Sequence, residues 1–164
     1  MSERVARYTA LRRHEYAAVV TTQDWHIDPG THFSDDPDYI DTWPPHGVAG
    51  TDEAELHPVL AGLNPDVSVR KGQYAAAYSG FEGVDADGRG LGDLLAAAGV
   101  DAVDVVGLAE SHCVLRTALD ALDEGLSVRV LTDLTAAVTP EQGESARELM
   151  ADAGVVLEPS TATA

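Results

Sequence analysis

The sequence predicts an α/β fold with three layers, in which helices cover both faces of a parallel β-sheet. Short apolar segments alternate along the chain with segments whose apolar residues recur at helical spacing, as in parallel strands joined by crossover helices. The strongest apolar segment, AVDVVGL at residues 102–108, has the nearly continuous apolar character of a strand buried on both faces. With 164 residues and no linker, we expect one domain over residues 1–158 and a disordered tail at residues 159–164.

Helices are expected where apolar residues recur at helical spacing and the flanking residues favour a helix end. Thr51 with the two acidic residues after it is typical of a helix N-terminus. Gly99, Gly125 and Gly154 each follow a predicted helix, at the position where helix C-termini favour glycine. The predicted helices lie at residues 3–15, 51–60, 89–98, 111–124 and 141–153.

Strands are expected in the short apolar segments between these helices. The stretch at residues 23–46 is rich in turn-forming residues and is predicted to be a loop. The predicted strands lie at residues 16–22, 67–70, 102–108, 127–132 and 155–157.

Acidic residues dominate the charge of the chain. The 28 Asp and Glu residues outnumber the 10 Lys and Arg residues, giving a formal net charge of −18. Nucleic acids and anionic membranes are bound by basic faces, so we expect neither as a partner. Small neutral or cationic substrates remain open, as does the oligomeric state. The sequence holds one cysteine and neither a signal-peptide pattern nor an apolar run of membrane length, so we expect a cytoplasmic protein.

Potential metal ligands gather in the predicted loop. Asp24 and His26 are two residues apart and would point to the same side of an extended segment. His32 and His46 follow in turn-rich sequence. One carboxylate with two or three imidazoles suits a divalent transition metal that keeps a coordination position open for chemistry. The spacing alone is equally compatible with solvent-exposed loop histidines.

A second candidate cluster lies where predicted strands end. Cys113 follows a strand and opens a helix, where the helix dipole would lower the thiol pKa and favour the thiolate. Lys71 ends another strand and is the only lysine of the chain; its ammonium would stabilise a thiolate further. In parallel sheets the carboxyl ends of the strands form the ligand crevice. The alternatives are a buried, inert cysteine and an ordinary surface lysine.

Four motifs, in this order, resemble the isochorismatase-like cysteine hydrolases, and among them the nicotinamidase (pyrazinamidase) branch. They are QDWHIDPGTHFS at 23–34, WPPHGVAGT at 43–51, RKGQYAAAYSGFEG at 70–83 and VVGLAESHCVLRTALDA at 105–121. The resemblance extends over about residues 3–157. It implies a metal-dependent amidohydrolase that converts nicotinamide to nicotinate and ammonia in NAD salvage, a part of pyridine nucleotide biosynthesis. Zinc, iron and manganese are the metals that the resemblance allows.

The resemblance also implies roles for individual residues. Cys113 matches the nucleophile and Lys71 the catalytic lysine. The Leu108-Ala109 bond matches a cis peptide that would direct the amides of Ala109 and Cys113 at an oxyanion. The substrate-pocket positions are matched by Trp43, Tyr78 and His112. The metal ligands are matched by Asp24, His26 and His46, with His32 as a further histidine found in some members.

The chain departs from the family at its beginning. Family members carry a first strand, ending in a catalytic aspartate, between the strands that match residues 16–22 and 102–108. That strand and aspartate have no match here, so we expect an isochorismatase-like fold lacking its first strand, with unpaired interior edges and uncovered Val19, Val103 and Val105. Either the true start lies upstream or the chain is a truncated, inactive metal-binding remnant. A third interpretation is a hydrolase of another small amide.

Overall fold

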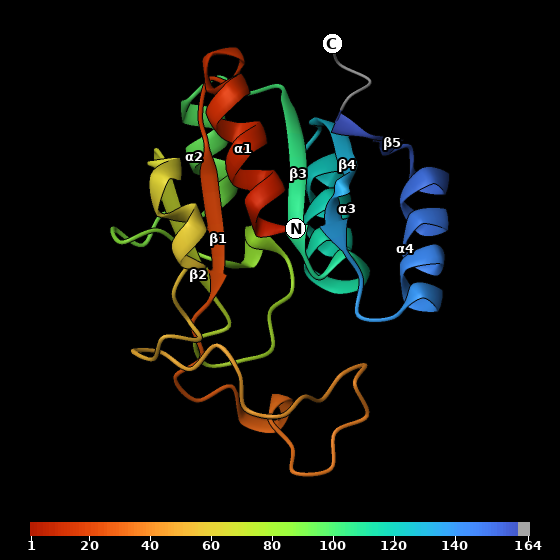
Figure 1. Cartoon of the computed structure of the whole chain (residues 1–164). Coiled ribbons are helices and arrows are strands. Elements are labelled where there is room, and N and C mark those ends of the chain that lie inside the picture. Colours follow the sequence, from red (N-terminus) through yellow and green to blue (C-terminus); the bar gives the residue numbers. More distant parts are fainter. Residues whose placement is uncertain (161–164) are drawn as a thin grey trace.

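The structure of the protein is a computed structural model that describes residues 1–160; residues 161–164, the last four of the predicted tail, lie outside the described residues. Parallel strands alternate with helices, which confirms the predicted α/β class (Figure 1). The helices are α1 (Ser2–Arg12), α2 (Leu91–Ala97), α3 (Leu115–Asp123) and α4 (Pro140–Ala153). The strands are β1 (Val20–Asp24), β2 (Val67–Lys71), β3 (Ala102–Leu108), β4 (Ser127–Ala136) and β5 (Val156–Glu158).

The strands form two separate parallel sheets. One sheet pairs β1 with β2, and the other has the order β3-β4-β5. Within the described part of the chain, β1 and β3 each pair with a strand on one side only, and these two strands face each other across a gap. Although β3 has the most apolar sequence, none of its residues is fully buried, because one of its edges borders the gap. Val19, Val103 and Val105 are all partly exposed, as the sequence predicted.

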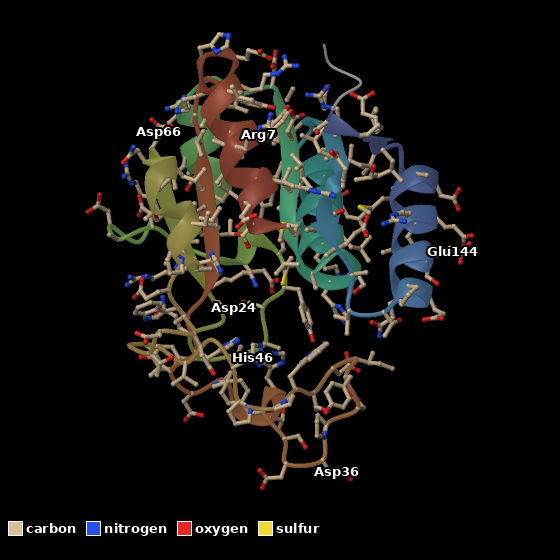
Figure 2. The ribbon with its side chains drawn as sticks, in the orientation of Figure 1. Arg7, Asp24, Asp36, His46, Asp66 and Glu144 are labelled. Atoms are coloured by element: carbon tan, nitrogen blue, oxygen red, sulfur yellow. The ribbon has the colours of Figure 1, made fainter. Side chains whose placement is uncertain are left out.

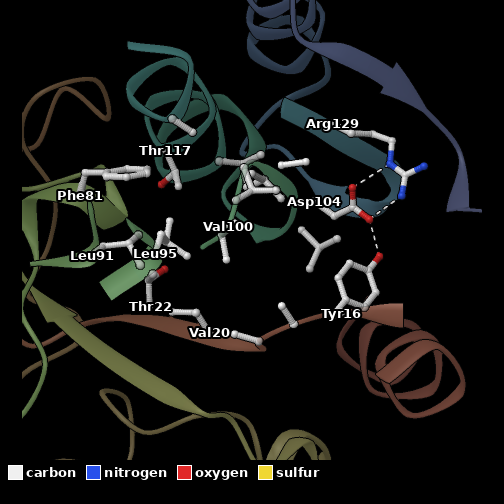
Figure 3. Close-up of a pocket in the computed structure, with 18 of the residues that line it drawn as sticks. Tyr16, Val20, Thr22, Phe81, Leu91, Leu95, Val100, Asp104, Thr117 and Arg129 are labelled. Carbon is white, nitrogen blue, oxygen red and sulfur yellow. Dashed lines mark hydrogen bonds and ion pairs between the residues drawn. The ribbon is translucent and has the colours of Figure 1, made fainter. Parts of the chain in front are cut away.

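A cavity of about 490 Å³ occupies the gap between the two sheets. Its walls are mostly apolar side chains from β1, α2 and β3, among them Val20, Leu95 and Val103 (Figure 3). Its lining also includes Tyr16, which precedes β1 in the chain, and Cys113, which follows β3. The cavity therefore reaches the residue that the sequence predicted as nucleophile.

Apolar clusters hold the helices on the two sheets. Met150 of α4 packs with Val130 of β4 in the main cluster, to which α3 also contributes. Leu95 of α2 packs against Val69 of β2, and Val5 of α1 joins a third cluster with β4. In Figure 1, α1 lies in front of the strands and α2 and α3 lie behind them, so helices cover both faces.

Two predicted elements differ from the structure for local reasons. The helix predicted at 51–60 is wrong: residues 51–54 form turns, and a 3₁₀ helix begins only at Pro58. Proline disfavours a helical conformation in the residue before it and is tolerated at a helix start, which explains this boundary. The helix predicted at 111–124 begins instead with a π-helical turn over Glu110–Val114.

At the end of the described residues, Ser160 donates from its backbone N–H and its hydroxyl to the Asp133 carboxylate, at 2.6 and 2.8 Å.

Among the helices of residues 1–160, none is both long enough and apolar enough to cross a membrane.

Candidate active site

The predicted site residues meet at the carboxyl ends of the strands. Asp24 is the last residue of β1, and Lys71 is the last residue of β2. Cys113 lies in the π-helical turn that follows β3, after a cis peptide bond between Leu108 and Ala109. Figure 2 shows Asp24 at this edge, with the loop that carries His46 beyond it. The chain thus brings both predicted clusters to one edge, the usual ligand crevice of parallel sheets.

Lys71 is the centre of the nucleophile cluster. It is only 3% exposed, and its ammonium group has three protons to donate. Its Nζ donates to the Ala77 carbonyl oxygen at 2.9 Å, lies 3.5 Å from Cys113 Sγ, and makes a short hydrogen bond to Asp24 Oδ1. Every ammonium proton therefore has a partner, as a buried cation requires.

Burial and charge oppose each other at Cys113. Burial raises the pKa of the thiol, the positive charge of Lys71 lowers it, and the negative charge of Asp24 raises it; the net shift is upward. The lowered pKa expected from the sequence is wrong, because burial outweighs the favourable charge. For Lys71, burial lowers the pKa, but the charges of Cys113 and Asp24 outweigh burial and raise it. Lys71 is therefore a stable ammonium beside a resting thiol.

The turn before Cys113 directs one backbone amide, that of Ala109, towards its sulfur. A backbone hydrogen bond from Ala109 lowers the pKa of Cys113, so the Ala109 amide faces the sulfur. The turn itself is closed by bonds from the amides of His112 and Val114 to the Ala109 carbonyl, both at 3.1 Å. An amide next to a nucleophile is suited to stabilise negative charge on a reacting carbonyl oxygen.

Three histidines converge beside this cluster. The possible ligand atoms of His26, His32 and His46 all lie within 4.8 Å of one another. Each ring approaches a backbone carbonyl oxygen through Nδ1: His26 with Gly72 at 2.6 Å, His32 with Asp41 at 3.2 Å and His46 with Pro44 at 2.8 Å. A carbonyl only accepts, so Nδ1 carries the proton and Nε2 is left with a free lone pair.

This histidine cluster fits a divalent metal. His26 Nε2 is buried and has no hydrogen-bond partner among the described residues, a costly arrangement unless a ligand accepts the lone pair. Burial lowers the pKa of His26 and of His32, which keeps both rings in the neutral form that binds metals. Asp24, which was predicted as a ligand together with His26 and His46, is not a member of this cluster and pairs with Lys71.

The predicted substrate residues form an aromatic wall beside the histidines. The ring centroids of Trp43 and His112 are 5.0 Å apart, and those of Tyr78 and His112 are 5.6 Å apart. Trp43 Nε1 donates to the Tyr78 hydroxyl at 3.1 Å, and that hydroxyl donates to the Ile40 carbonyl oxygen at 3.0 Å. The bonds fix the rings in place, so the wall can receive a flat ring without rearrangement.

Two residues near the site were not predicted from the sequence. Phe33 contacts all three histidine rings, with centroid distances of 5.2 to 5.9 Å; its place next to His32 was a usable signal. Glu110 begins the turn that carries Cys113, is fully buried and accepts two hydrogen bonds from Arg147 at 2.8 Å. Glu110 and Arg147 are far apart in the sequence, and their spacing does not indicate that they form an ion pair.

The chain belongs to the isochorismatase family: the model of the isochorismatase domain matches residues 3–162. Its relatives within that family include amide hydrolases. The chain is 52% identical over 143 residues to the nicotinamidase/pyrazinamidase of Mycobacterium tuberculosis, an alignment that covers 87% of this chain and 77% of that protein. These matches confirm the resemblance of the four motifs.

Solved structures of related proteins have the same fold as this chain. The nicotinamidase of Acinetobacter baumanii is 32% identical, with a TM-score of 0.84 over 99% of this chain and 87% of that one. The pyrazinamidase of Pyrococcus horikoshii, solved in complex with zinc, is 33% identical, with a TM-score of 0.80 over 95% of this chain and 83% of that one. The isochorismatase-like fold is thereby confirmed.

Proposed function

We propose that this protein is a nicotinamidase, which hydrolyses nicotinamide to nicotinate and ammonia with Cys113 as nucleophile. The observation that carries the proposal is the position of the Cys113 sulfur, which lies 3.5 Å from Lys71 Nζ and interacts electrostatically with Tyr78 of the aromatic wall. A flat ring resting on this wall would present its amide to the sulfur. The relatives named nicotinamidase support the same substrate.

The proposed reaction has two stages. The Cys113 thiol gives up its proton as the sulfur attacks the amide carbon. Lys71 stabilises the thiolate charge before the C–S bond forms, and the attack transfers that charge to the carbonyl oxygen. The amides of Ala109 and Cys113 would bind the oxyanion, at roughly 3 kcal/mol for each donor. The C–N bond breaks, and the amine takes up the thiol proton and leaves as ammonia. Water then hydrolyses the thioester, which releases nicotinate and restores the thiol.

We propose His26, His32 and His46, which converge in the structure, as ligands of a divalent metal, together with Asp24, which the resemblance also implies as a ligand. The bound metal would supply a Lewis acid that holds the pyridine nitrogen of the substrate and orients the ring. Zinc, iron and manganese all accept imidazole ligands; zinc is favoured by the related structure solved with it. The roles in NAD salvage and the cytoplasmic location stay predictions.

Nicotinamide turnover tests the proposal. Purified protein supplied with zinc, iron or manganese in turn should release nicotinate and ammonia in equal amounts, and Cys113→Ala should release neither. If the protein binds metal but leaves nicotinamide and related amides intact, the inactive-remnant interpretation holds. If it hydrolyses other small amides and leaves nicotinamide intact, the branch assignment is wrong while the hydrolase class stands.

A further inference from the structure

The turn that carries the nucleophile is bound to α4 by a buried carboxylate. The turn extends over Glu110–Val114, and its first residue, Glu110, is fully buried. The two oxygens of the Glu110 carboxylate accept hydrogen bonds from Nε and Nη2 of Arg147 on α4, both at 2.8 Å. No other donor to this carboxylate is described within residues 1–160, so its orientation depends on Arg147.

Two further contacts hold the same turn against α4 and the segment before it. Gly143 brings the backbone of α4 close to the turn, because a Cβ at this position would lie 3.6 Å from Glu110 Oε2. The Ser111 hydroxyl accepts a hydrogen bond from the amide of Val138 at 3.4 Å and bonds to His112 Nδ1 at 2.9 Å. The side of the turn that faces away from the gap therefore rests on α4.

We propose that the ion pair of Glu110 and Arg147 positions the nucleophile, by fixing the turn in which the Cys113 sulfur and the Ala109 amide face each other. Both members of the pair are positioning residues, because neither has a described contact with the sulfur. The inference rests on the proposed function, in which Cys113 is the nucleophile, and it adds two residues on the far side of the turn from the substrate.

The energetics of buried ion pairs separate positioning from stability. Glu110 is fully buried, whereas the Arg147 side chain is 49% exposed, so the carboxylate bears most of the desolvation cost. A well-packed apolar pair of similar size often keeps the stability of a fold or raises it. An apolar pair has no direction, however, while the guanidinium binds the carboxylate through two parallel N–H groups and fixes its orientation. The pair is therefore expected to act on the geometry of the turn.

The reaction is sensitive to the geometry of this turn in a particular way. Ala109 precedes Glu110 directly and Cys113 follows three residues later, so a turn that is free to move displaces the oxyanion donor and the sulfur. A displacement of about 1 Å can lower a rate about a hundredfold. Lys71 and most of the aromatic wall belong to other segments, and only His112 of the wall lies in the turn. We therefore expect kcat to fall while KM changes little.

The test replaces both partners together, in Glu110→Leu/Arg147→Met, so that no charge is left buried without a partner. The urea midpoint of unfolding should stay near the wild-type value, kcat for nicotinamide should fall by about tenfold or more, and KM should stay within about twofold. If the double variant does not fold, Arg147→Lys keeps the charge and loses the two-bond fork. Its kcat should then lie below that of the wild type at unchanged KM.

Alkylation of Cys113 gives a second readout that needs no substrate. The protein has a single cysteine, which is partly buried, and its reaction with iodoacetamide at one fixed pH is followed by intact mass on metal-loaded protein. The rate should rise several-fold in Glu110→Leu/Arg147→Met, because a turn that is no longer fixed exposes the sulfur. If the wild type leaves nicotinamide intact, the proposed function fails, and the alkylation rates still decide this inference.

Asp104→Leu/Arg129→Met is the matched control. It removes an ion pair of the same kind, with a 2.7 Å hydrogen bond, that joins β3 to β4 and has no described contact with the turn. Its kcat and its alkylation rate, both corrected for the folded fraction, should match the wild type.

Three results would overturn the inference. The first is a folded Glu110→Leu/Arg147→Met with wild-type kcat and alkylation rate, which would limit the pair to a structural role. The second is an equal change in the control variant, which would mean that the loss of any ion pair loosens the site. The third is a raised KM at unchanged kcat, which would assign the pair to substrate binding.

Discussion

The two ends of the gap between the sheets carry similar groups and do different work. At the carboxyl ends of the strands, the Asp24 carboxylate binds Lys71, which contacts the Cys113 thiol. At the amino ends, the Asp104 carboxylate on β3 accepts a short hydrogen bond from the Tyr16 hydroxyl and two bonds from Arg129, of which the one from Nε is 2.7 Å long (Figure 3). Each end thus joins a cation, a carboxylate and a weak acid across the gap.

The weak acid and the cation make the difference. Burial and the hydrogen bond to Asp104 raise the pKa of Tyr16 far above its usual value, so the phenol keeps its proton and serves only as a donor. Arg129 stays charged at any relevant pH and also binds Glu158 of β5 at 2.8 Å. A thiol ionises more readily and is a stronger nucleophile. The amino end therefore ties the sheets together, while the carboxyl end is suited to chemistry.

The largest expected effect comes from Cys113→Ala, which should abolish nicotinamide hydrolysis, by at least about a thousandfold. The substitution removes the nucleophile and leaves the histidine cluster untouched. Nicotinate release and metal content, measured on the same preparation, check it. Metal content should match that of the wild type; retained turnover would remove Cys113 from its proposed role.

His26→Ala should lower metal occupancy, because it deletes the most buried of the three converging imidazoles. Elemental analysis after dialysis against a fixed low metal concentration gives the occupancy. His57→Ala is a suitable control, since His57 is an exposed histidine outside the cluster. Unchanged occupancy in His26→Ala would move the metal site elsewhere.

At the other end of the gap, Asp104→Ala should destabilise the fold by about 2 kcal/mol, because it removes the acceptor that joins Tyr16 to Arg129 and leaves them only their bonds to Tyr8 and Glu158. Urea unfolding measures the loss. The pH dependence of the rate at which iodoacetamide alkylates Cys113 should match that of the wild type. Asp104 makes no described hydrogen bond or ion pair with Asp24, Lys71 or Cys113. If Asp104→Ala changed the alkylation rate of Cys113 but not the free energy of unfolding, the amino end would affect the chemistry and would not stabilise the fold, contrary to this account.

The smallest expected effect is that of Tyr16→Phe, which removes one hydroxyl donor and should cost about 1 kcal/mol of unfolding free energy. Tyr74→Phe provides the comparison, because Tyr74 is 69% exposed and removal of its hydroxyl should leave stability unchanged. Equal stability of the two variants would show that the Tyr16–Asp104 bond does not hold the sheets together.

The contrast between the two ends also explains what the sequence could and could not predict. Cys113 and Lys71 were identified because strand ends are visible in the apolar pattern, and the carboxyl ends of parallel strands meet at one edge. The upward shift of the Cys113 pKa was missed because burial depends on the tertiary fold. The pairing of Asp24 with Lys71 was missed for the same reason: spacing placed Asp24 beside the histidines but says nothing of β2 as its neighbour.

The elements show the same limit. The strand predicted at 102–108 is confirmed residue for residue, because its apolar run is long and sharply bounded. The strand predicted at 16–22 begins only at Val20, since Tyr16 turns to Asp104 across the gap before the strand starts. Local pattern decides the first case and a distant contact decides the second. The Tyr16–Asp104–Arg129 network had no sequence signal at all.

The most direct test of the division between the two ends is the initial rate of nicotinate formation by the wild type, Cys113→Ala and Tyr16→Phe, measured side by side on metal-loaded protein. We expect Tyr16→Phe to match the wild type under conditions where it is folded, and Cys113→Ala to form no nicotinate. Turnover by Cys113→Ala, or its loss in folded Tyr16→Phe, would contradict the assignment of the chemistry to the carboxyl end.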